Sequence, residues 1–255
     1  MTDHAQLPLP FEAPDAIPSV AIAADWKDQP RGWGHPFHPI CTWLGAMPPA
    51  MAHALIERFS RPGDVVLDPF SGRGTVPLQA CLRRRIGVGV DRNPLAALLT
   101  GAVVEPPSRR DAQARLARLR IDWTHEAARR REEADALAAG SDTAAALFHP
   151  RTLAEILFLR ASLDRHDRVD RFLLAALVGI LHGARPSFLT DAMPNAFSLA
   201  PGYSAGWLGA RGEARPRRDA FALLERRVDR LYRSGIPVGR GIAIDGDART
   251  AAADV

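Results

Sequence analysis

The chain has 255 residues, of which 47% are hydrophobic, so it can bury a substantial core as one α/β domain with an insertion or as two small domains. Its net charge of +4 comes almost wholly from arginine, because Lys27 is the sole lysine, and this balance suits a polyanionic partner. No apolar run is long enough to span a membrane, and the polar start from Met1 to Gln6 is not typical of a signal peptide. Cys41 and Cys81 belong to no C-x-x-C motif, which favours the cytoplasm, with reduced thiols.

The first part of the chain leads toward a helix. Residues 1–34 are rich in Pro, Ala, Asp and Gly without periodicity, which predicts a poorly ordered or loosely docked arm. The segment from His38 to Pro49 is aromatic and contains several prolines. The apolar residues that follow predict one face of a helix, and they are Met51, Leu55, Ile56 and Phe59.

A glycine-containing turn follows the apolar run 65–67, which predicts a strand, and precedes a predicted helix over Pro77 to Arg84. Its sequence is Asp68-Pro69-Phe70-Ser71-Gly72-Arg73-Gly74-Thr75. Gly72 and Gly74 lack a Cβ, so a ligand can approach the main chain closely. Asp68 stands at the carboxyl end of the strand, where open α/β sheets bind ligands. Neither G-x-G-x-x-G nor a P-loop occurs here, which argues against a nucleotide-phosphate site.

This octapeptide resembles motif I of the S-adenosylmethionine (SAM) dependent amino-methyltransferases, whose D-P-F-x-G-x-G-T turn cradles the methionine end of the cofactor. The resemblance implies cofactor binding by seven residues of the turn, namely Asp68, Pro69, Phe70, Ser71, Gly72, Gly74 and Thr75. It also implies that the segment from His38 to Pro49 closes over the cofactor. Burial of Phe37 and Trp43 in a core is the alternative interpretation of that segment.

A second apolar run, Ile86 to Val90, predicts strand two, and Asp91 ends it. An acidic residue at this place can accept hydrogen bonds from both ribose hydroxyls, each worth roughly 1.5–3 kcal/mol. We therefore predict that Asp91 binds the ribose, with helix capping as the simpler alternative. The helical pattern at Leu95, Leu98 and Leu99 then leads to a proline break after residue 104.

The middle of the chain predicts helices. Arginines and acids mix with apolar residues from Arg109 to Glu133, a pattern that favours structural helices with a charged, solvated face over DNA contact. Two further helical patterns cover Thr152 to Leu163 and Arg171 to Leu181, and the second is apolar enough for a core. Met193 to Pro201 predicts an ordered loop, for which contact with the target is one interpretation.

The last part of the chain predicts a helix over Asp219 to Tyr232 and a third strand over Gly241 to Ile244 with an acidic tip. Within that tip, Asp247 resembles the residue that contacts the adenine of the cofactor. The stretch 252–255 predicts the start of a fourth strand, which in the resembling family runs into a catalytic tetrapeptide of Asp/Asn/Ser-Pro-Pro and an aromatic residue.

The segment Glu105-Pro106-Pro107-Ser108 has the prolines of that tetrapeptide but neither its first residue nor its aromatic. We therefore assign no catalytic residue, and no pattern assigns a metal ligand. We expect the chain to be a truncated product or fragment, or a half that a second polypeptide completes.

These patterns predict an α/β fold, and the resemblance implies an incomplete SAM-methyltransferase Rossmann-like sheet with a helical insertion. The predicted segments are an arm (1–34), a SAM-binding βαβ half (35–108), the helical insertion (109–235), and the third strand with the start of the fourth (236–255). The predicted function is the cofactor-binding part of a DNA amino-methyltransferase that acts on N4 of cytosine or N6 of adenine and is inactive alone. An RNA amino-methyltransferase and a non-catalytic SAM-binding or nucleic-acid-binding module are the alternatives.

Overall fold

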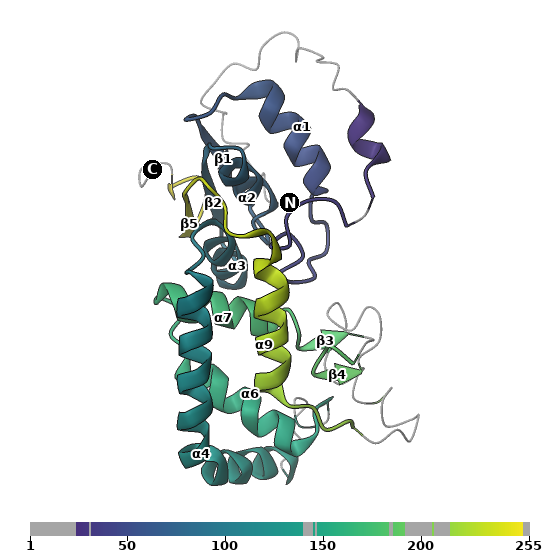
Figure 1. Cartoon of the computed structure of the whole chain (residues 1–255), viewed down its shortest axis with the longest axis vertical. Coiled ribbons are helices and arrows are strands. Elements are labelled where there is room, and N and C mark those ends of the chain that lie inside the picture. The colour runs from purple at the N-terminus through teal and green to yellow at the C-terminus, as the bar shows by residue number, and fades with distance from the viewer. Residues whose placement is uncertain are drawn as a thin grey trace, which may run out of the picture.

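The computed structural model describes residues 24–30, 32–139, 145, 147–183, 186–191, 206 and 215–251. Two parts are stacked along the long axis of the molecule, a parallel sheet with its helices and a helical part (Figure 1). The chain crosses between them twice. It leaves the sheet part through α4 (Arg109–Ala139) and returns through α9 (Ala220–Leu231).

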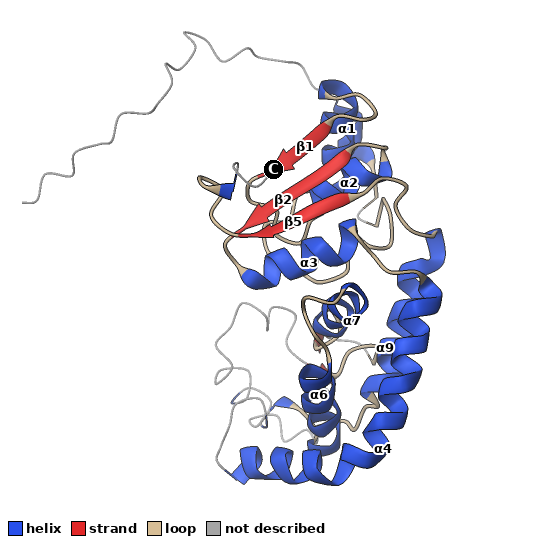
Figure 2. Cartoon of the chain, turned by 90° about the vertical axis from the view of Figure 1, so that its left-hand side faces the viewer, coloured by secondary structure: helices blue, strands red, loops and turns tan. Residues whose placement is uncertain are grey.

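The sheet contains β1 (Val65–Asp68), β2 (Ile86–Asp91) and β5 (Gly241–Asp245). The strands are parallel in the order β1-β2-β5, and they lie side by side in Figure 2. Each strand extends one residue beyond its predicted end and so includes the acidic residue that follows the apolar run. The combination of a small parallel sheet with flanking helices is compatible with a Rossmann-like methyltransferase fold, as the sequence predicted.

Two helices cover one face of the sheet, and glycines in the strands permit their close approach. These helices are α2 (Thr75–Leu82) and α3 (Pro94–Val104). A Cβ at Gly87 in β2 would lie 2.1 Å from a carbonyl oxygen of α2, and one at Gly241 in β5 would lie 2.6 Å from a valine of α3. Strand glycines of this kind therefore set the distance between the sheet and its helices.

The other side of β1 is an open edge. β1 has no second partner strand among the described residues, and its side chains Val65 and Leu67 are 55% and 49% exposed. Helix α1 (Pro49–Phe59), which packs against α2, borders this edge. An apolar groove of about 480 Å³ lies between α1 and β1.

In the helical part, α4 packs against α6 (Pro150–Ser162), α7 (Arg168–Val178) and α9. The pattern that predicted several helices from Arg109 to Glu133 belongs to one helix, because α4 is continuous over 31 residues. In the described part of the chain, no helix is long and apolar enough to cross a bilayer.

Four short elements complete the structure, and the sequence predicted none of them. They are η1 (Ala24–Asp28), β3 (His182–Gly183), β4 (Thr190–Asp191) and η3 (Tyr232–Ser234). The predicted loop from Met193 to Pro201 and the predicted start of a fourth strand at 252–255 lie outside the described residues.

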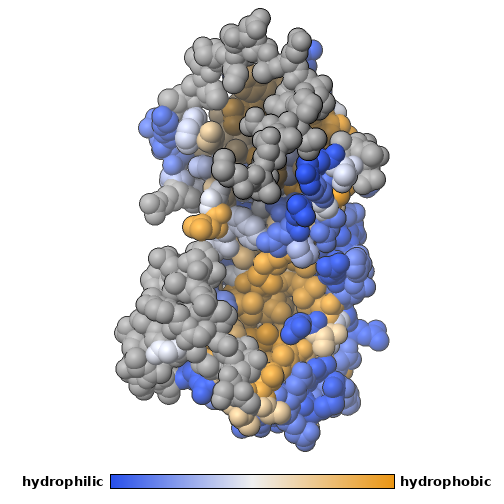
Figure 3. Space-filling model, turned by 180° about the vertical axis from the view of Figure 1, so that it is seen from behind, coloured by the Kyte–Doolittle hydropathy of each residue, from blue (hydrophilic) through white to orange (hydrophobic). Residues whose placement is uncertain are grey.

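One apolar core links the sheet part to the helical part. Phe37 is fully buried, with its ring centroid 5.6 Å from that of Phe172 in α7 and 5.5 Å from that of Tyr232 after α9. Arg227 of α9 donates hydrogen bonds to the carbonyl oxygens of Pro39 and Ile40. These contacts anchor the segment before α1 between the two parts. Seen from behind, apolar surface gathers over the helical part and charged side chains border it (Figure 3).

Candidate functional site

The turn after β1 is a fixed structure. Gly72 and Gly74 have φ angles of +53° and +82°, a region that side chains with a Cβ rarely adopt. The Gly74 N–H donates to the carbonyl oxygen of Ser71 at 2.8 Å, and the Ser71 N–H donates to Val90 of β2 at 3.0 Å. The hydroxyls of Ser71 and Thr100, on α3, lie 3.0 Å apart. Strand two and α3 therefore hold the turn in place.

Trp43 lies against this turn. A Cβ at Gly72 would be 2.9 Å from the indole Nε1 of Trp43, so the indole occupies the space that any side chain at this position would need. Phe37 belongs to the core, as the alternative interpretation of this segment predicted. Trp43 is partly buried, packs against the same core and also borders the turn.

Asp91 joins the carboxyl ends of the first two strands. Its Oδ2 accepts a hydrogen bond from the Gly72 N–H at 2.9 Å, and its Oδ1 accepts one from the Asn93 N–H at 2.9 Å. A carboxylate can accept about four hydrogen bonds, so Asp91 retains capacity for two more donors. Asp68 makes a similar local bond, because its Oδ1 accepts from the Phe70 N–H at 3.0 Å.

The two carboxylates make this corner negative. Burial raises the pKa of Asp68, and the nearby negative charge of Asp91 raises it further, while the hydrogen bond from Phe70 lowers it. Neither Asp68 nor Asp91 forms an ion pair with any residue in the described part of the chain. The pair can therefore accept a ligand that carries positive charge or hydroxyl donors.

A hydrogen-bonded series of polar side chains, from His38 through Gln79 to His53, positions the segment that carries Trp43. The His38 Nε2 lies 3.0 Å from the Gln79 Oε1 in α2, and the Gln79 Nε2 lies 3.1 Å from the His53 Nδ1 in α1. The amide orientation makes His38 the donor and His53 the acceptor. Burial is the main cause that lowers the pKa of His38 to about 4, so its imidazole is neutral at pH 7. The sequence patterns did not predict these hydrogen bonds. Their one signal in the sequence is Gln79, a glutamine within an otherwise apolar helix.

Asp247 is engaged by neighbouring arginines. The guanidinium of Arg249 donates to both carboxylate oxygens, and a guanidinium nitrogen of Arg92 lies 3.7 Å from the Asp247 Oδ2. The hydrogen bonds from Arg249 hold the pKa of Asp247 well below its usual range. The Gly246 N–H donates to the carbonyl oxygen of Asp91 at 3.1 Å, which ties the tip of β5 to that of β2. Asp247 thus lies beside the site with its oxygens already paired.

The other predicted turn residues differ in exposure. Phe70 is 82% exposed, and Pro69 borders the groove between α1 and β1. Ser71 and Thr75 are buried, so their side chains support the turn from the interior of the protein. The structure thus brings Asp68, the glycines and Asp91 together, and it directs Phe70 outward.

The segment Glu105-Pro106-Pro107-Ser108 has a structural role. The segment follows the end of α3 and lies near the amino end of β5. The turn lies at the carboxyl ends of the strands, so the segment and the turn are at opposite ends of the sheet. The carbonyl oxygen of Pro107 accepts a hydrogen bond from the Tyr232 hydroxyl at 2.8 Å, and the carboxylate of Glu105 pairs with Arg171 at 2.8 Å. These contacts anchor the segment to η3 and α7.

A pocket of about 410 Å³ adjoins the turn on the side of the helical part. Trp43 and Leu44 form one wall, Leu95 at the start of α3 forms another, and Leu181 with His182 closes it. The pocket is lined mainly by apolar side chains, which suits a planar or apolar group beside the turn.

The fold is compatible with a Rossmann-like α/β methyltransferase arrangement. Within it, residues 34–98 match the N6/N4-methyltransferase family, described as DNA methylase. The match spans the aromatic segment, the turn, β2 and the first residues of α3, and it confirms the predicted resemblance to the DNA amino-methyltransferases. Comparison with curated proteins and with solved structures gave no significant match.

Proposed function

We propose that this chain binds SAM and serves as the cofactor-binding part of a DNA amino-methyltransferase, with N4 of cytosine or N6 of adenine as the acceptor. The observation that carries the proposal is the hydrogen bond between Asp91 and Gly72. It joins the carboxyl ends of two parallel strands inside the segment that matches the DNA methylase family.

The chemistry of the corner fits this cofactor. SAM carries a sulfonium and an ammonium group, and the carboxylates of Asp68 and Asp91 offer negative charge to them. The spare acceptor capacity of Asp91 suits the ribose hydroxyls. The positive φ angles of Gly72 and Gly74 shape the turn beside these carboxylates, and the Trp43 indole lies against Gly72. When bound, SAM supplies an electrophilic methyl group, and the residues of this chain bind and orient the cofactor.

Asp247 is proposed as the contact to the adenine. Its carboxylate lies next to the tip of β2 but is paired with Arg249, which is exposed and therefore able to move away. Pro69, Phe70, Ser71 and Thr75 complete the proposed cofactor-binding set. In this proposal residues 35–108 and 236–255 form the cofactor unit, and the insertion 109–235 faces the nucleic acid.

Methyl transfer also needs groups that hold the acceptor amine, and we propose that a strand from a second polypeptide supplies them. The open edge of β1 supports this arrangement, because an edge strand offers free backbone donors and acceptors to an incoming strand. The exposed side chains of Val65 and Leu67 and the groove along α1 offer apolar contacts to it. On this proposal the chain alone binds SAM without transferring its methyl group.

The test is calorimetric titration of SAM into the wild type and into Asp68→Asn, Asp91→Asn and Asp245→Asn. Asp245 is the matched control, because it lies opposite Asp91 in the register of β2 and β5, is exposed, and forms no hydrogen bond through its side chain among the described residues. We expect weaker binding in the first two variants only. Equal affinity in all four proteins would remove the proposed site.

A methyl-transfer assay with labelled SAM, using duplex DNA and structured RNA as acceptors, separates the remaining possibilities. SAM binding without transfer to either acceptor agrees with the proposed partner-dependent site. Transfer by the chain alone would contradict the need for a second polypeptide, and transfer to RNA in preference to DNA would favour the RNA enzyme.

A further inference from the structure

We infer that a groove beside α9 binds the phosphate backbone of DNA. The groove has a volume of about 570 Å³ and is lined on the α9 side by Arg226, Arg230 and Arg233, and on the other side by Pro186 and Ser187. The inference rests on the proposed function, because it identifies where the nucleic acid of a DNA methyltransferase makes its sequence-independent contacts. It assigns the contact to a surface that sequence analysis had not singled out.

The spacing of the arginines matches a polyanion. Arg226 and Arg230 are four residues apart on α9, and Arg233 follows in η3, so the three side chains leave one face of the helix at steps of about 6 Å and 4.5 Å. The resulting span of about 10 Å along the helix corresponds to about three phosphate spacings of one DNA strand, which are about 3.4 Å each along the duplex axis. All three residues are exposed.

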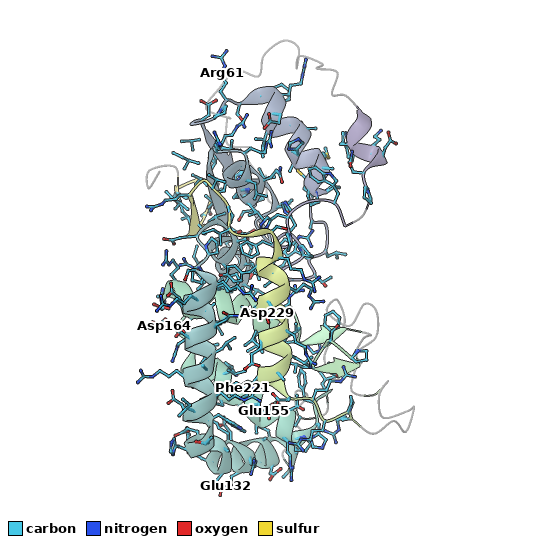
Figure 4. The ribbon with its side chains drawn as sticks, in the orientation of Figure 1. Arg61, Glu132, Glu155, Asp164, Phe221 and Asp229 are labelled. Carbon is cyan, nitrogen blue, oxygen red and sulfur yellow. The ribbon has the colours of Figure 1, made fainter. Side chains whose placement is uncertain are left out.

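The positive charge of this face is not neutralised by any of the described residues. Asp229 also lines the groove, but its Oδ1 accepts hydrogen bonds from Arg109 at 2.8 Å and from Gln113 at 3.0 Å, both on α4. Figure 4 shows Asp229 on α9 at the side that faces α4. Among the described residues, none forms an ion pair or hydrogen bond with the guanidinium groups that line the groove.

The remaining acids of α9 are also paired, since Arg120 binds both Asp219 at its start and Glu225 in its first half. The face of α9 toward the groove therefore carries three positive charges that no residue in the described part of the chain pairs with. Such a surface raises the local concentration of a polyanion and gains free energy by releasing the counterions of DNA.

Arg227, in the same helix, has a structural role that differs from that of the arginines in the groove. Arg227 is buried, and its guanidinium donates to two carbonyl oxygens of the segment before α1. Within the ranges that the structure describes, the arginines of the groove have no such partners. Structural packing thus accounts for Arg227 and leaves Arg226, Arg230 and Arg233 for a partner outside the chain.

The groove is also correctly placed relative to the turn. Leu181 and His182 close the pocket beside Trp43, and the same short segment continues to Pro186 and Ser187 at the groove. A strand of DNA held along α9 can therefore extend toward the pocket next to the proposed cofactor site.

The experiment measures binding of a fluorescent 25-base-pair DNA duplex of arbitrary sequence, with and without unlabelled structured RNA as competitor, across a series of salt concentrations. The test protein carries Arg226→Gln, Arg230→Gln and Arg233→Gln in the full chain. The control carries Arg61→Gln, Arg118→Gln and Arg131→Gln, which removes the same charge from exposed arginines away from the groove. Figure 4 places Arg61 at the far end of the sheet part.

We expect the groove variant to bind DNA about 100-fold more weakly at 0.15 M salt, and the slope of log K against log salt to become shallower by about 2.7, because each lost phosphate contact changes the slope by about 0.9. The control should stay close to the wild type. Equal losses in the two variants, or no binding of duplex DNA by the wild type, would overturn the inference that the groove binds DNA. Preferential displacement of DNA by the structured RNA would overturn the choice of DNA.

Binding of SAM, measured on the same three proteins, keeps the two proposals apart. Normal SAM affinity in the groove variant shows that it is folded and that the cofactor site is intact. If SAM binds and the two variants do not differ in DNA binding, the groove is not the DNA-binding surface, whereas the proposed function stands. If no protein binds SAM, the proposed function fails whatever the DNA result.

Discussion

The carboxylate of Asp91 accepts a hydrogen bond from the backbone N–H of Gly72, 2.9 Å away, across the gap between the ends of β2 and β1. Through this bond Asp91 contributes to the shape of the turn, and together with Asp68 it contributes to the charge of the site. Because Gly72 has a positive φ and is crowded by Trp43, the bond also fixes the turn in a conformation that few residues tolerate. The turn and the aromatic segment should therefore respond together to changes at position 72.

Gly72→Ala should destabilise the protein and abolish SAM binding. Alanine at a φ of +53° costs about 1–2 kcal/mol in backbone strain, and its Cβ would lie 2.9 Å from the Trp43 indole. Gly63→Ala is the matched control, because Gly63 also has a positive φ but nothing lies within 4 Å of its Cβ position. Urea unfolding and SAM titration check both variants. Normal SAM affinity in Gly72→Ala would contradict the proposed role of the turn.

The buried imidazole of His38 should make stability depend on pH. Its pKa of about 4 in the folded protein lies below the ordinary value of 6.5, so the unfolded chain binds more protons between these values and stability falls as the pH falls. From pH 7.5 to 4.5 the contribution is about 2.5 kcal/mol. Urea unfolding of His38→Gln should show this part of the pH dependence removed, whereas His125→Gln, on the exposed side of α4, should retain it. An unchanged pH dependence in His38→Gln would show that other histidines carry it.

Arg249 should compete with the cofactor for Asp247. Arg249→Gln removes the hydrogen bonds that the guanidinium donates to the carboxylate and leaves the one from the backbone N–H, so SAM should bind more tightly to this variant than to the wild type. Asp247→Asn should weaken binding, and the double variant should bind like Asp247→Asn alone, which a double-mutant cycle by calorimetry measures. If Arg249→Gln has the same effect with and without Asp247, the two residues are not coupled in cofactor binding.

The local patterns of the sequence predicted the elements that build the site. The apolar runs that end at Leu67, Val90 and Ile244 are strands, and the glycine turn lies between β1 and α2, because these features depend on residues close in the chain. Helix α4 was predicted in pieces, since its many charges conceal a continuous helix that is held by packing on α6 and α9.

Contacts between distant segments could not be predicted in the same way. The chain from His38 to Gln79 to His53 joins three elements, and nothing in the local sequence pairs them. The groove beside α9 depends on where the segment after β3 lies, which only the tertiary structure defines. Sequence patterns gave the arginines of α9 no special role, because their partners inside and outside the protein are set by packing.

The open edge of β1 should promote self-association, because an exposed apolar edge strand is a template for another strand. Val65 is 55% exposed on this strand, so Val65→Lys should alter the free energy of unfolding by no more than about 0.5 kcal/mol. The added charge should reduce association, measured by sedimentation velocity over a range of protein concentrations. Val238→Lys is the matched control, since Val238 is 76% exposed in the connection between α9 and β5, away from the edge. Equal association of the two variants would show that the edge of β1 does not pair, and it would weaken the proposal that a strand from a second polypeptide completes the sheet there.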